Sequence, residues 1–429
     1  MKTQKAHEKK LKNGLRIITV PMEDNPTVTV LVMVEAGTRY ETHATNGLSH
    51  FLEHMCFKGT EKREAKQIAY ELEAMGAVTN AFTAYDYTGY YAKGRADLFP
   101  RLLDVVSDVY LNSTFPEAEI EKERGVICGE IDMYEDLPQR AVHDLFVKSI
   151  FGDQPAGYTI LGPKENMKRF TRADFAQYHK DRYVAEKTIV VVAGNITQAE
   201  SNKLVSEAFK TIKTGKVIRK KKIDKAQAMN PAQKIMIKSK KTDQSHLVIG
   251  MPSLPVGHKD RTAFEVLIGV LGLGMSSRLF TKLREEMGAG YYLRGVVGYT
   301  QDSDDTSDLN ISTGTEPKRV PEVISAIMGE MKRLKTEPVP LHELKKVQES
   351  LVGRIYMGLE ASDDVAFHTA HYAILHQPLK TPKQIEQETR KITVADLTRV
   401  AKQYLTPEKM HLALIGPHDN SLEIEKALC

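Results

Sequence analysis

The sequence predicts an α+β protein of two homologous domains, each a mixed sheet with packed helices. Two observations predict it. The chain has 429 residues, too many for one small domain and suitable for two of about 200 each. A motif that begins Thr-x-Ala-Asp recurs with its following residues at a constant offset, at Thr171 and again at Thr393. Because each copy has the pattern of a capped helix, a turn and an apolar strand, the repeat indicates two equivalent α+β units.

The repeat also predicts where the domains lie. We expect a first domain over residues 1–214 and a second over 233–429, joined by a linker of residues 215–232. In both halves the recurring segment ends in an apolar strand, predicted at 188–193 and at 410–415.

Composition and charge exclude several classes of protein. The net charge of +4 is small for this length, and the Lys/Arg run at 219–222, interpreted as a solvated linker face, has no interleaved aromatic residues. No nucleic-acid partner is therefore expected. No apolar run reaches the roughly 18 residues of a membrane span, and the basic N-terminus lacks the apolar stretch of a signal peptide. Three cysteines argue against a disulfide framework. We therefore expect a cytoplasmic protein, with Cys56 and Cys128 as small buried thiols.

One short segment has the spacing of a metal site. His50, Glu53 and His54 form the pattern H-x-x-E-H. On a helix the two histidines project from the same side one turn apart, where two imidazoles can bind one metal ion. Glu53 lies on that side and can take a proton from a metal-bound water. Two histidines at this spacing also occur in surfaces and cores without a metal. The helix itself is predicted by apolar residues at helical spacing, namely Leu48, Phe51, Leu52 and Met55.

A second helix offers a third ligand. It is predicted to begin near Pro116 and to be capped by Ser113 or Thr114. Glu123 and Glu130 lie two turns apart on it and flank its apolar stripe. A carboxylate beside an apolar stripe is costly unless it is paired or bound to a metal. The alternative is two solvated carboxylates at the edge of the stripe.

Together these segments resemble the pitrilysin family, which includes the mitochondrial processing peptidases and the insulin-degrading enzymes. In that family H-x-x-E-H is followed further along the chain by a segment like E-R-x-x-x-x-x-E, whose last Glu binds zinc. Here Glu123-Arg124 precedes Glu130 in the same way. The resemblance implies one Zn²⁺ per chain. The roles it implies are zinc ligands for His50, His54 and Glu130, the catalytic base for Glu53, and a contact that supports a ligating imidazole for Glu123.

The segment 76–90 is rich in Thr, Tyr and Phe and predicts a strand that is buried on one face. It is similar to the strand beside the zinc in the family, along which a substrate peptide lies as an added strand. The resemblance therefore implies a substrate-binding role for Asn80, Ala81, Phe82 and Thr83. By itself the pattern indicates only a structural strand.

In the second half, the segments 274–280 and 283–291 resemble the family's C-terminal signature. Arg284 and Tyr291 match an Arg/Tyr pair that reaches the active site from the other domain. The resemblance implies that they hydrogen-bond the substrate carbonyl and stabilise the developing oxyanion. The alternative makes Arg284 a surface cation on a helix beside other charged residues.

The resemblance as a whole implies a zinc-dependent metalloendopeptidase that hydrolyses extended or unfolded peptides. It also implies a clamshell of the two domains around an enclosed chamber, and a homodimer. The rival hypothesis is a non-catalytic partner subunit or peptide-binding member of the same family. A second metal cluster, of His368, His371 and His376, is weaker because it lacks a base and a matched third ligand.

Overall fold

The computed structural model of the chain describes residues 5–228, 230–290, 297–419 and 422–428. The chain divides into two compact units, and each is built from separate stretches of sequence. The first unit comprises residues 1–131, 158–222 and 356–381, and the second comprises 132–157, 223–355 and 382–429.

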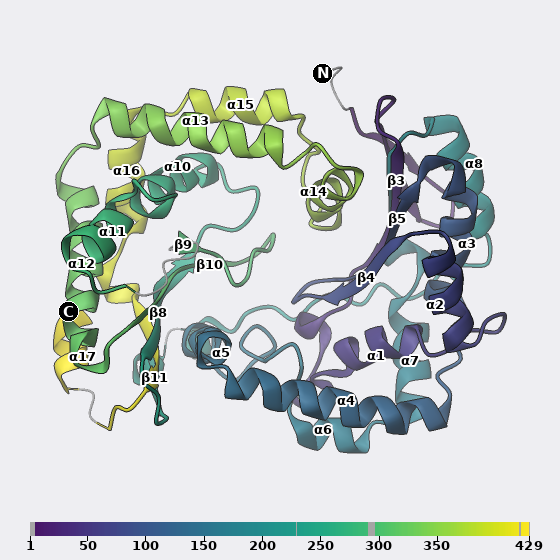
Figure 1. The fold of residues 1–429 in the computed structure, drawn as a ribbon, viewed down its shortest axis with the longest axis horizontal. Helices are drawn as coiled ribbons and strands as arrows, with labels where there is room; N and C mark the ends of the chain where they lie inside the picture. The colour runs from purple at the N-terminus through teal and green to yellow at the C-terminus, as the bar shows by residue number, and fades with distance from the viewer. Residues whose placement is uncertain (1–4, 229, 291–296, 420–421, 429) are drawn as a thin grey trace. The chain divides into compact units, whose positions relative to one another are not determined.

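The first unit contains a six-stranded mixed sheet (Figure 1). Its strands are β1 (His7–Lys10), β2 (Arg16–Pro21), β3 (Thr27–Val34), β4 (Val78–Thr83), β5 (Thr88–Arg95) and β6 (Thr188–Gly194). The order is β1-β2-β6-β3-β5-β4, with β2 and β6 parallel and the other neighbours antiparallel. Strand β4 therefore lies at one edge of the sheet, and none of the described strands pairs with its outer side.

One strand predicted from the sequence is two. The segment 76–90 holds β4, the start of β5 and a connection of residues 84–87, so the single strand predicted there is wrong. The amide of Ala84 donates to the carbonyl of Tyr87 and closes the connection. This turn has none of the Asn-Gly or Gly-Gly pairs that mark a tight hairpin in a sequence, which is why the pattern looks continuous.

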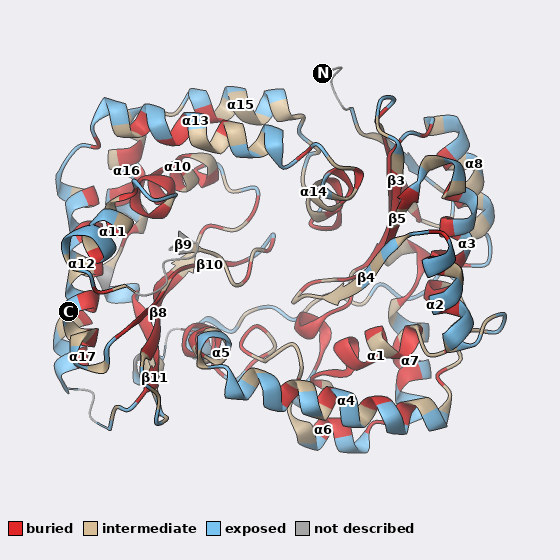
Figure 2. Ribbon diagram, in the orientation of Figure 1, coloured by how far each residue is buried: buried red, intermediate tan, exposed pale blue. Residues whose placement is uncertain are grey.

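Helices cover both faces of the first sheet. The helices of the first unit are α1 (Leu48–Cys56), α2 (Ala65–Ala74), α3 (Phe99–Leu111), α4 (Glu117–Asp136, whose last turn belongs to the second unit), α6 (Lys164–Arg169), α7 (Arg172–Arg182), α8 (Gln198–Ala208) and α14 (Ser362–Ile374). On β3, Val28, Val30 and Val32 face the main core with α3, whereas Thr29 hydrogen-bonds Ser362 of α14. Because both faces are covered, β3 has an almost continuous apolar sequence, and Figure 2 shows it buried.

The second unit contains a five-stranded sheet. Its strands are β7 (Ile235–Ser239), β8 (Ser245–Ser253), β9 (Val297–Gly298), β10 (Ser307–Thr315) and β11 (His411–Gly416). The order is β7-β11-β8-β10-β9. Its helices are α5 (Pro138–Phe151), α9 (Lys225–Ala228), α10 (Arg261–Gly272), α11 (Arg278–Phe280), the π-helical turn η6 (Thr281–Glu286), α12 (Val320–Thr336), α13 (Leu341–Met357), α15 (Pro382–Arg390), α16 (Val394–Tyr404) and α17 (Leu422–Leu428).

The two sheets repeat one topology. Strand β6 runs parallel to β2 and antiparallel to β3, and β11 runs parallel to β7 and antiparallel to β8. The helix before each of these strands begins with a capping box, formed by Thr171 with Asp174 in α7 and by Thr393 with Asp396 in α16. The predicted α+β organisation in two equivalent parts is confirmed.

Each half of the sequence gives one helix to the other unit. Helix α5 packs on β8 and β11, where a Cβ at Gly250 would meet the ring of Phe146. Helix α14 packs on β3 and β6 of the first sheet. The compact units are therefore discontinuous, whereas the predicted domains are continuous; the boundaries at 214 and 233 and the clamshell stay predictions.

Two smaller expectations concern the surface. Within the Lys/Arg run, Lys220 is only partly solvated, because its ammonium lies 3.1 Å from a carboxylate oxygen of the buried Asp86. In the part of the chain that the structure describes, no helix combines the length and apolar character needed to cross a bilayer.

Candidate metal centre

The first-unit helix α1 carries three of the predicted site residues. Its predicted apolar residues, Leu48, Phe51, Leu52 and Met55, are all buried in the main core. Gly47, with a φ of 93°, precedes the helix in the left-handed region that favours glycine. The apolar side of α1 anchors the helix, so its other side presents His50, Glu53 and His54 in fixed positions.

A carboxylate from outside the helix caps α1. Glu41 is fully buried and accepts hydrogen bonds from the backbone amides of Gly47 and Ser49, at 2.9 and 2.8 Å. It also accepts one from the side-chain amide of Asn46, at 3.0 Å. The first amides of a helix have no partner within the helix, and a negative charge is favourable there. Glu41 therefore holds the first turn of α1, which contains His50.

Three side chains converge as a metal-ligand set. Nε2 of His50 lies 3.8 Å from Oε2 of Glu130, and Nε2 of His54 lies 3.9 Å from the same oxygen. All three ligand atoms lie within 4.8 Å of one another. Ligands about 2.0–2.2 Å from zinc at tetrahedral angles lie about 3.4 Å apart. These atoms are too far apart to hydrogen-bond and close enough to share one metal ion.

The state of His50 fits that ligand set. Burial, with a smaller contribution from His54, lowers the pKa of His50 to about 3, so its imidazole is neutral at pH 7. Its Nδ1 is buried and has no hydrogen-bond partner among the described residues. A neutral imidazole keeps a lone pair on one ring nitrogen, and this is the form in which histidine binds a metal ion. Two imidazoles and one carboxylate, with a fourth position open, are typical of catalytic zinc.

Helix α4 supplies the two glutamates. Ile120, Ile127 and Ile131 form its buried stripe, and Glu123 beside them is 6% exposed. The alternative from the sequence, in which both carboxylates are solvated, is therefore wrong for Glu123. Glu130 is partly exposed.

The predicted cap of α4 is also wrong. The hydroxyl of Ser113 donates to the carbonyls of Cys56 and Val109, and that of Thr114 donates to the carbonyl of Gly59. These two hydroxyls tie the segment before α4 to neighbouring segments. The first carbonyl that accepts from amides of the helix is that of Pro116, so the capping position lies after Ser113 and Thr114.

Glu123 links the metal site to a cation. Its Oε2 lies 3.0 Å from Nδ1 of His54, and its Oε1 lies 2.5 Å from Nζ of Lys58. Burial by itself raises the pKa of Glu123, but the hydrogen bonds and charges of Lys58 and His54 outweigh it and hold the pKa below its usual value. An ionised Glu123 accepts the Nδ1 proton of His54, so Nε2 keeps its lone pair for a metal.

Glu53 lies beside the ligands and is oriented by a threonine. The hydroxyl of Thr83 on β4 donates to Oε2 of Glu53 at 2.5 Å. Burial raises the pKa of Glu53; Thr83 and His54 oppose that rise, and the charge of Glu130 adds to it. A buried carboxylate with a raised pKa is suited to taking up and releasing a proton near neutral pH.

The four residues predicted to bind substrate all lie on β4, at the edge of the first sheet. They do not share a face. Thr83 points toward Glu53, whereas the ring of Phe82 points away and packs 5.5 Å from the ring of Phe367 on α14. The side-chain oxygen of Asn80 accepts a hydrogen bond from the amide of Ala81. Their substrate role stays a prediction.

The predicted residues of the second half are placed only in part. Arg284 lies in η6, and its guanidinium carbon lies 5.7 Å from the ring centre of Phe280. Tyr291 lies outside the described residues. The predicted role of the pair at the oxyanion stays a prediction.

The second histidine cluster does not form a metal-ligand set. Nδ1 of His371 lies 3.2 Å from the hydroxyl of Tyr87, and Nε2 of His376 lies 3.0 Å from a carboxylate oxygen of Glu35. Among the described residues, no group able to hold a metal includes His368, His371 or His376. His371 and His376 help to attach α14 and its following residues to the first unit.

Sequence reasoning missed Glu41 and Lys58. Neither has a local signal: Glu41 precedes the helix it caps by more than one turn, and Lys58 follows the H-x-x-E-H motif as one lysine among many. Thr83 was predicted as part of a strand, not as the hydrogen-bond donor to Glu53. All three act through contacts that form only after the chain has folded.

Known proteins resemble this chain along most of its length. Residues 16–164 match the family described as Insulinase (Peptidase family M16), and residues 169–351 match the one described as Peptidase M16 inactive domain. An uncharacterized zinc protease of Bacillus subtilis is 35% identical over 95% of this chain and 97% of its own length. Another, from Streptomyces coelicolor, is 32% identical over 95% of this chain and 88% of its own length.

Solved structures share the fold. A protease from Helicobacter pylori has a TM-score of 0.85 at 23% identity and covers 97% of this chain and 100% of its own. A protein from Pseudomonas fluorescens, described as a peptidase M16 inactive domain, has a TM-score of 0.87 at 16% identity, covering 96% of this chain and 98% of its own.

Proposed function

The chain belongs to peptidase family M16, and on that premise we propose that it is a zinc-dependent metalloendopeptidase with one Zn²⁺ per chain. The observation that carries the proposal is the convergence of His50, His54 and Glu130 beside the carboxylate of Glu53. The relatives named as zinc proteases support the choice of metal. A zinc ion held by these three side chains would lower the pKa of water and polarise the scissile carbonyl.

The chain's own residues would then carry the proton. Glu53 takes a proton from the attacking water and passes it to the leaving amine, and Thr83 keeps its carboxylate oriented for both transfers. Glu123 holds the tautomer of His54. Arg284 and Tyr291 supply the oxyanion contacts that the family resemblance implies.

The substrate we propose is an extended or unfolded peptide. The outer side of β4 can accept such a peptide as an added strand, through main-chain hydrogen bonds. The side chain of Asn80 now accepts the amide proton of Ala81. A carbonyl of the bound peptide would accept this amide proton in place of Asn80, so that binding of the peptide exchanges one hydrogen bond for another. A folded protein offers no free strand of this kind, so it would be a poor substrate.

Two measurements on the purified full-length chain test the proposal. Metal analysis should find close to one zinc per chain, and a quenched fluorescent peptide should be cleaved internally. Glu53→Gln should keep the zinc and lose turnover by several orders of magnitude, because it removes the base and keeps the ligands.

The rival function is a non-catalytic subunit that binds peptides for a partner. That reading predicts peptide binding without cleavage, and equal behaviour of the wild type and Glu53→Gln. A wild-type preparation with negligible zinc would overturn the metal assignment itself. Sedimentation of the zinc-loaded chain tests the predicted homodimer.

A further inference from the structure

Lys58 lies one step beyond the residues that touch the metal ligands. Its ammonium contacts one oxygen of Glu123, and the other oxygen of the same carboxylate contacts His54. The side chain of Glu123 is 8% exposed and that of Lys58 is 27% exposed. An ion pair this well covered is screened less by solvent than a surface pair. A continuous line of contacts therefore runs from Lys58 through Glu123 to His54.

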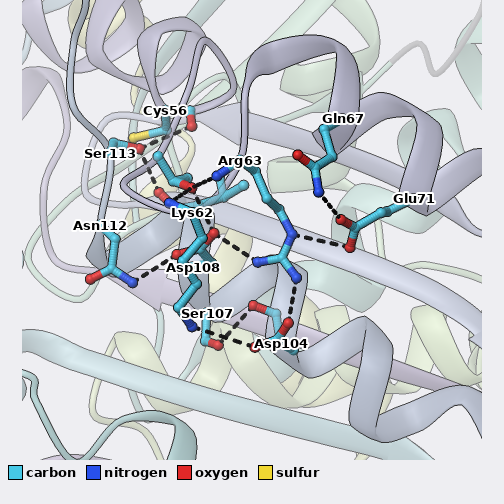
Figure 3. A network of polar contacts seen from close by, with 12 residues as sticks. Cys56, Lys62, Arg63, Gln67, Glu71, Asp104, Ser107, Asp108, Asn112 and Ser113 are labelled. Carbon is cyan, nitrogen blue, oxygen red and sulfur yellow. Dashed lines mark hydrogen bonds and ion pairs between the residues drawn. The ribbon is translucent and has the colours of Figure 1, made fainter.

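The loop that carries Lys58 is held in place by a clamp, meaning the hydrogen bonds and ion pairs of Thr60 and Arg63. Residues 57–63 follow α1, and within them the amide of Thr60 donates to the carbonyl of Arg63 at 2.8 Å. Figure 3 shows the guanidinium of Arg63 between the carboxylates of Glu71, Asp104 and Asp108. The hydroxyl of Thr60 donates to Oδ2 of Asp108 at 2.7 Å, and this is the oxygen that the Arg63 guanidinium also contacts. Asp108 is 1% exposed, so this clamp is anchored on α3 inside the first unit.

Glu123, the partner of Lys58, lies on a helix whose preceding segment is hydrogen-bonded to the same loop. The segment that leads from α3 into α4 is bonded to the loop after α1: the hydroxyl of Ser113 donates to the carbonyl of Cys56 (Figure 3), and the amide of Thr114 donates to that of Gly59. Helix α4, which bears Glu123, starts just after this segment. The backbone positions of Lys58 and Glu123 are thus set by one junction.

From this geometry we propose that Lys58 is a positioning residue of the metal site. It fixes the carboxylate of Glu123 so that one oxygen stays aimed at Nδ1 of His54, and His54 in turn presents Nε2 to the metal. The inference rests on the proposed zinc site and adds to it a residue outside the ligand set. Without the ammonium, the carboxylate of Glu123 can rotate toward water or the loop amides, and His54 loses its fixed tautomer and orientation.

The charge of Lys58 also affects zinc affinity, and this effect is opposite in sign to the effect of positioning. A cation near the site repels Zn²⁺, so removal of its charge alone would tighten zinc binding. Loss of a group that orients a ligating histidine typically weakens metal binding by about 10–100-fold. Because Lys58 acts through Glu123, we expect the lower end of that range. The sign of the change in affinity therefore separates positioning from simple charge.

The test is zinc affinity of the full-length chain, measured by competition with a chromogenic chelator. Lys58→Met keeps the apolar stem and removes the ammonium, and it should weaken zinc binding about 10-fold. Lys122→Met is the matched control, because the exposed Lys122 lies beside Glu123 on α4 but pairs with Glu119. The control should leave the affinity unchanged.

A double-mutant cycle shows whether Lys58 acts through Glu123. Glu123→Gln should weaken zinc binding at least as much as Lys58→Met, and adding Lys58→Met to it should weaken zinc binding no further. Lys58→Arg should restore most of the affinity.

Unchanged or tighter zinc binding in Lys58→Met overturns the inference, and so do fully additive effects in the cycle. If the wild type binds no zinc, the proposed function fails together with the inference. If the wild type binds zinc and only Lys58→Met behaves as wild type, the inference alone fails. A melting temperature for each variant identifies any that do not fold.

Discussion

Thr83→Val should change the pH dependence of peptide cleavage without changing metal content. The substitution keeps the shape of the side chain and removes the hydroxyl that donates to Glu53. A hydrogen bond to the ionised form of a carboxylate lowers its pKa, so its loss raises the pKa of Glu53 further above the ordinary value of 4.5. The contributions of His54 and Glu130 stay in place.

The magnitude follows from the type of bond. A hydrogen bond to a charged group contributes about 1.5–3 kcal/mol, and about 1.36 kcal/mol corresponds to one pKa unit. Water can replace part of the lost bond, because Glu53 is 9% exposed. We therefore expect the pKa of Glu53 to rise. The base must be ionised, so the acidic limb of kcat/KM should move to higher pH, with about a 10- to 100-fold loss of kcat/KM below the limb.

The assay is a pH profile of kcat/KM with zinc-saturated enzyme and a quenched peptide. Thr79→Val is the matched control: its hydroxyl, on the same strand, donates to the carbonyl of Tyr91 and not to Glu53. The control should keep the wild-type profile. An acidic limb that stays in place in Thr83→Val, or moves to lower pH, would refute the assignment of Glu53 as the base whose ionisation limits the rate.

Three further predictions concern the ligands, the second half and the cap. His54→Ala and Glu130→Gln should each lose zinc and activity together, measured by metal analysis and peptide cleavage, because two remaining ligands hold zinc weakly. Arg284→Ala should lower kcat by about 100- to 1,000-fold with zinc content unchanged, and wild-type turnover would make Arg284 a surface residue. Glu41→Ala removes the acceptor of two buried backbone amides, those of Gly47 and Ser49, at about 1–3 kcal/mol each, whereas the side-chain amide of Asn46 keeps the carbonyl of Thr159 as an acceptor. Hydrogen exchange at the start of α1 should accelerate, and protection equal to the wild type would argue against the cap.

The spacing of residues near one another in the sequence predicted individual helices and strands, because their structure depends on those near neighbours. Helix α1 follows from apolar residues at helical intervals, and the same intervals place His50 and His54 on one side of it. The repeat of Thr171 and Thr393 predicted two capped helices, each followed by a buried strand, and both are present. These features involve neighbours within a few residues of each other, where helix geometry and capping determine the structure.

The features that were missed depend on contacts between distant segments. Phe82 and Thr83 are adjacent in one strand, yet their different partners come from α14 and α1. The exchange of α5 and α14 between units has no signature in either helix, because an amphipathic helix can pack on any apolar face. Lys58 becomes informative only when α4 brings Glu123 against it. The sequence pattern carries no record of such partners.

The two units share a fold, but the candidate metal-binding residues are not part of what they share. Both units have the same strand order around the same parallel pair, but the described metal-ligand set with two histidines lies in the first unit alone. Its residues lie on α1 and α4 and not in the repeated core of the sheet. The buried carboxylates of Glu53 and Glu123 are costly to keep in a core unless they are paired or serve a bound cation. Glu123 is paired on both oxygens, whereas the described hydrogen bond to Glu53 comes from a neutral hydroxyl. A buried glutamate held only by a neutral hydroxyl has no structural role that glutamine could not fill, and this asymmetry supports the proposed catalytic role of Glu53 over a peptide-binding function.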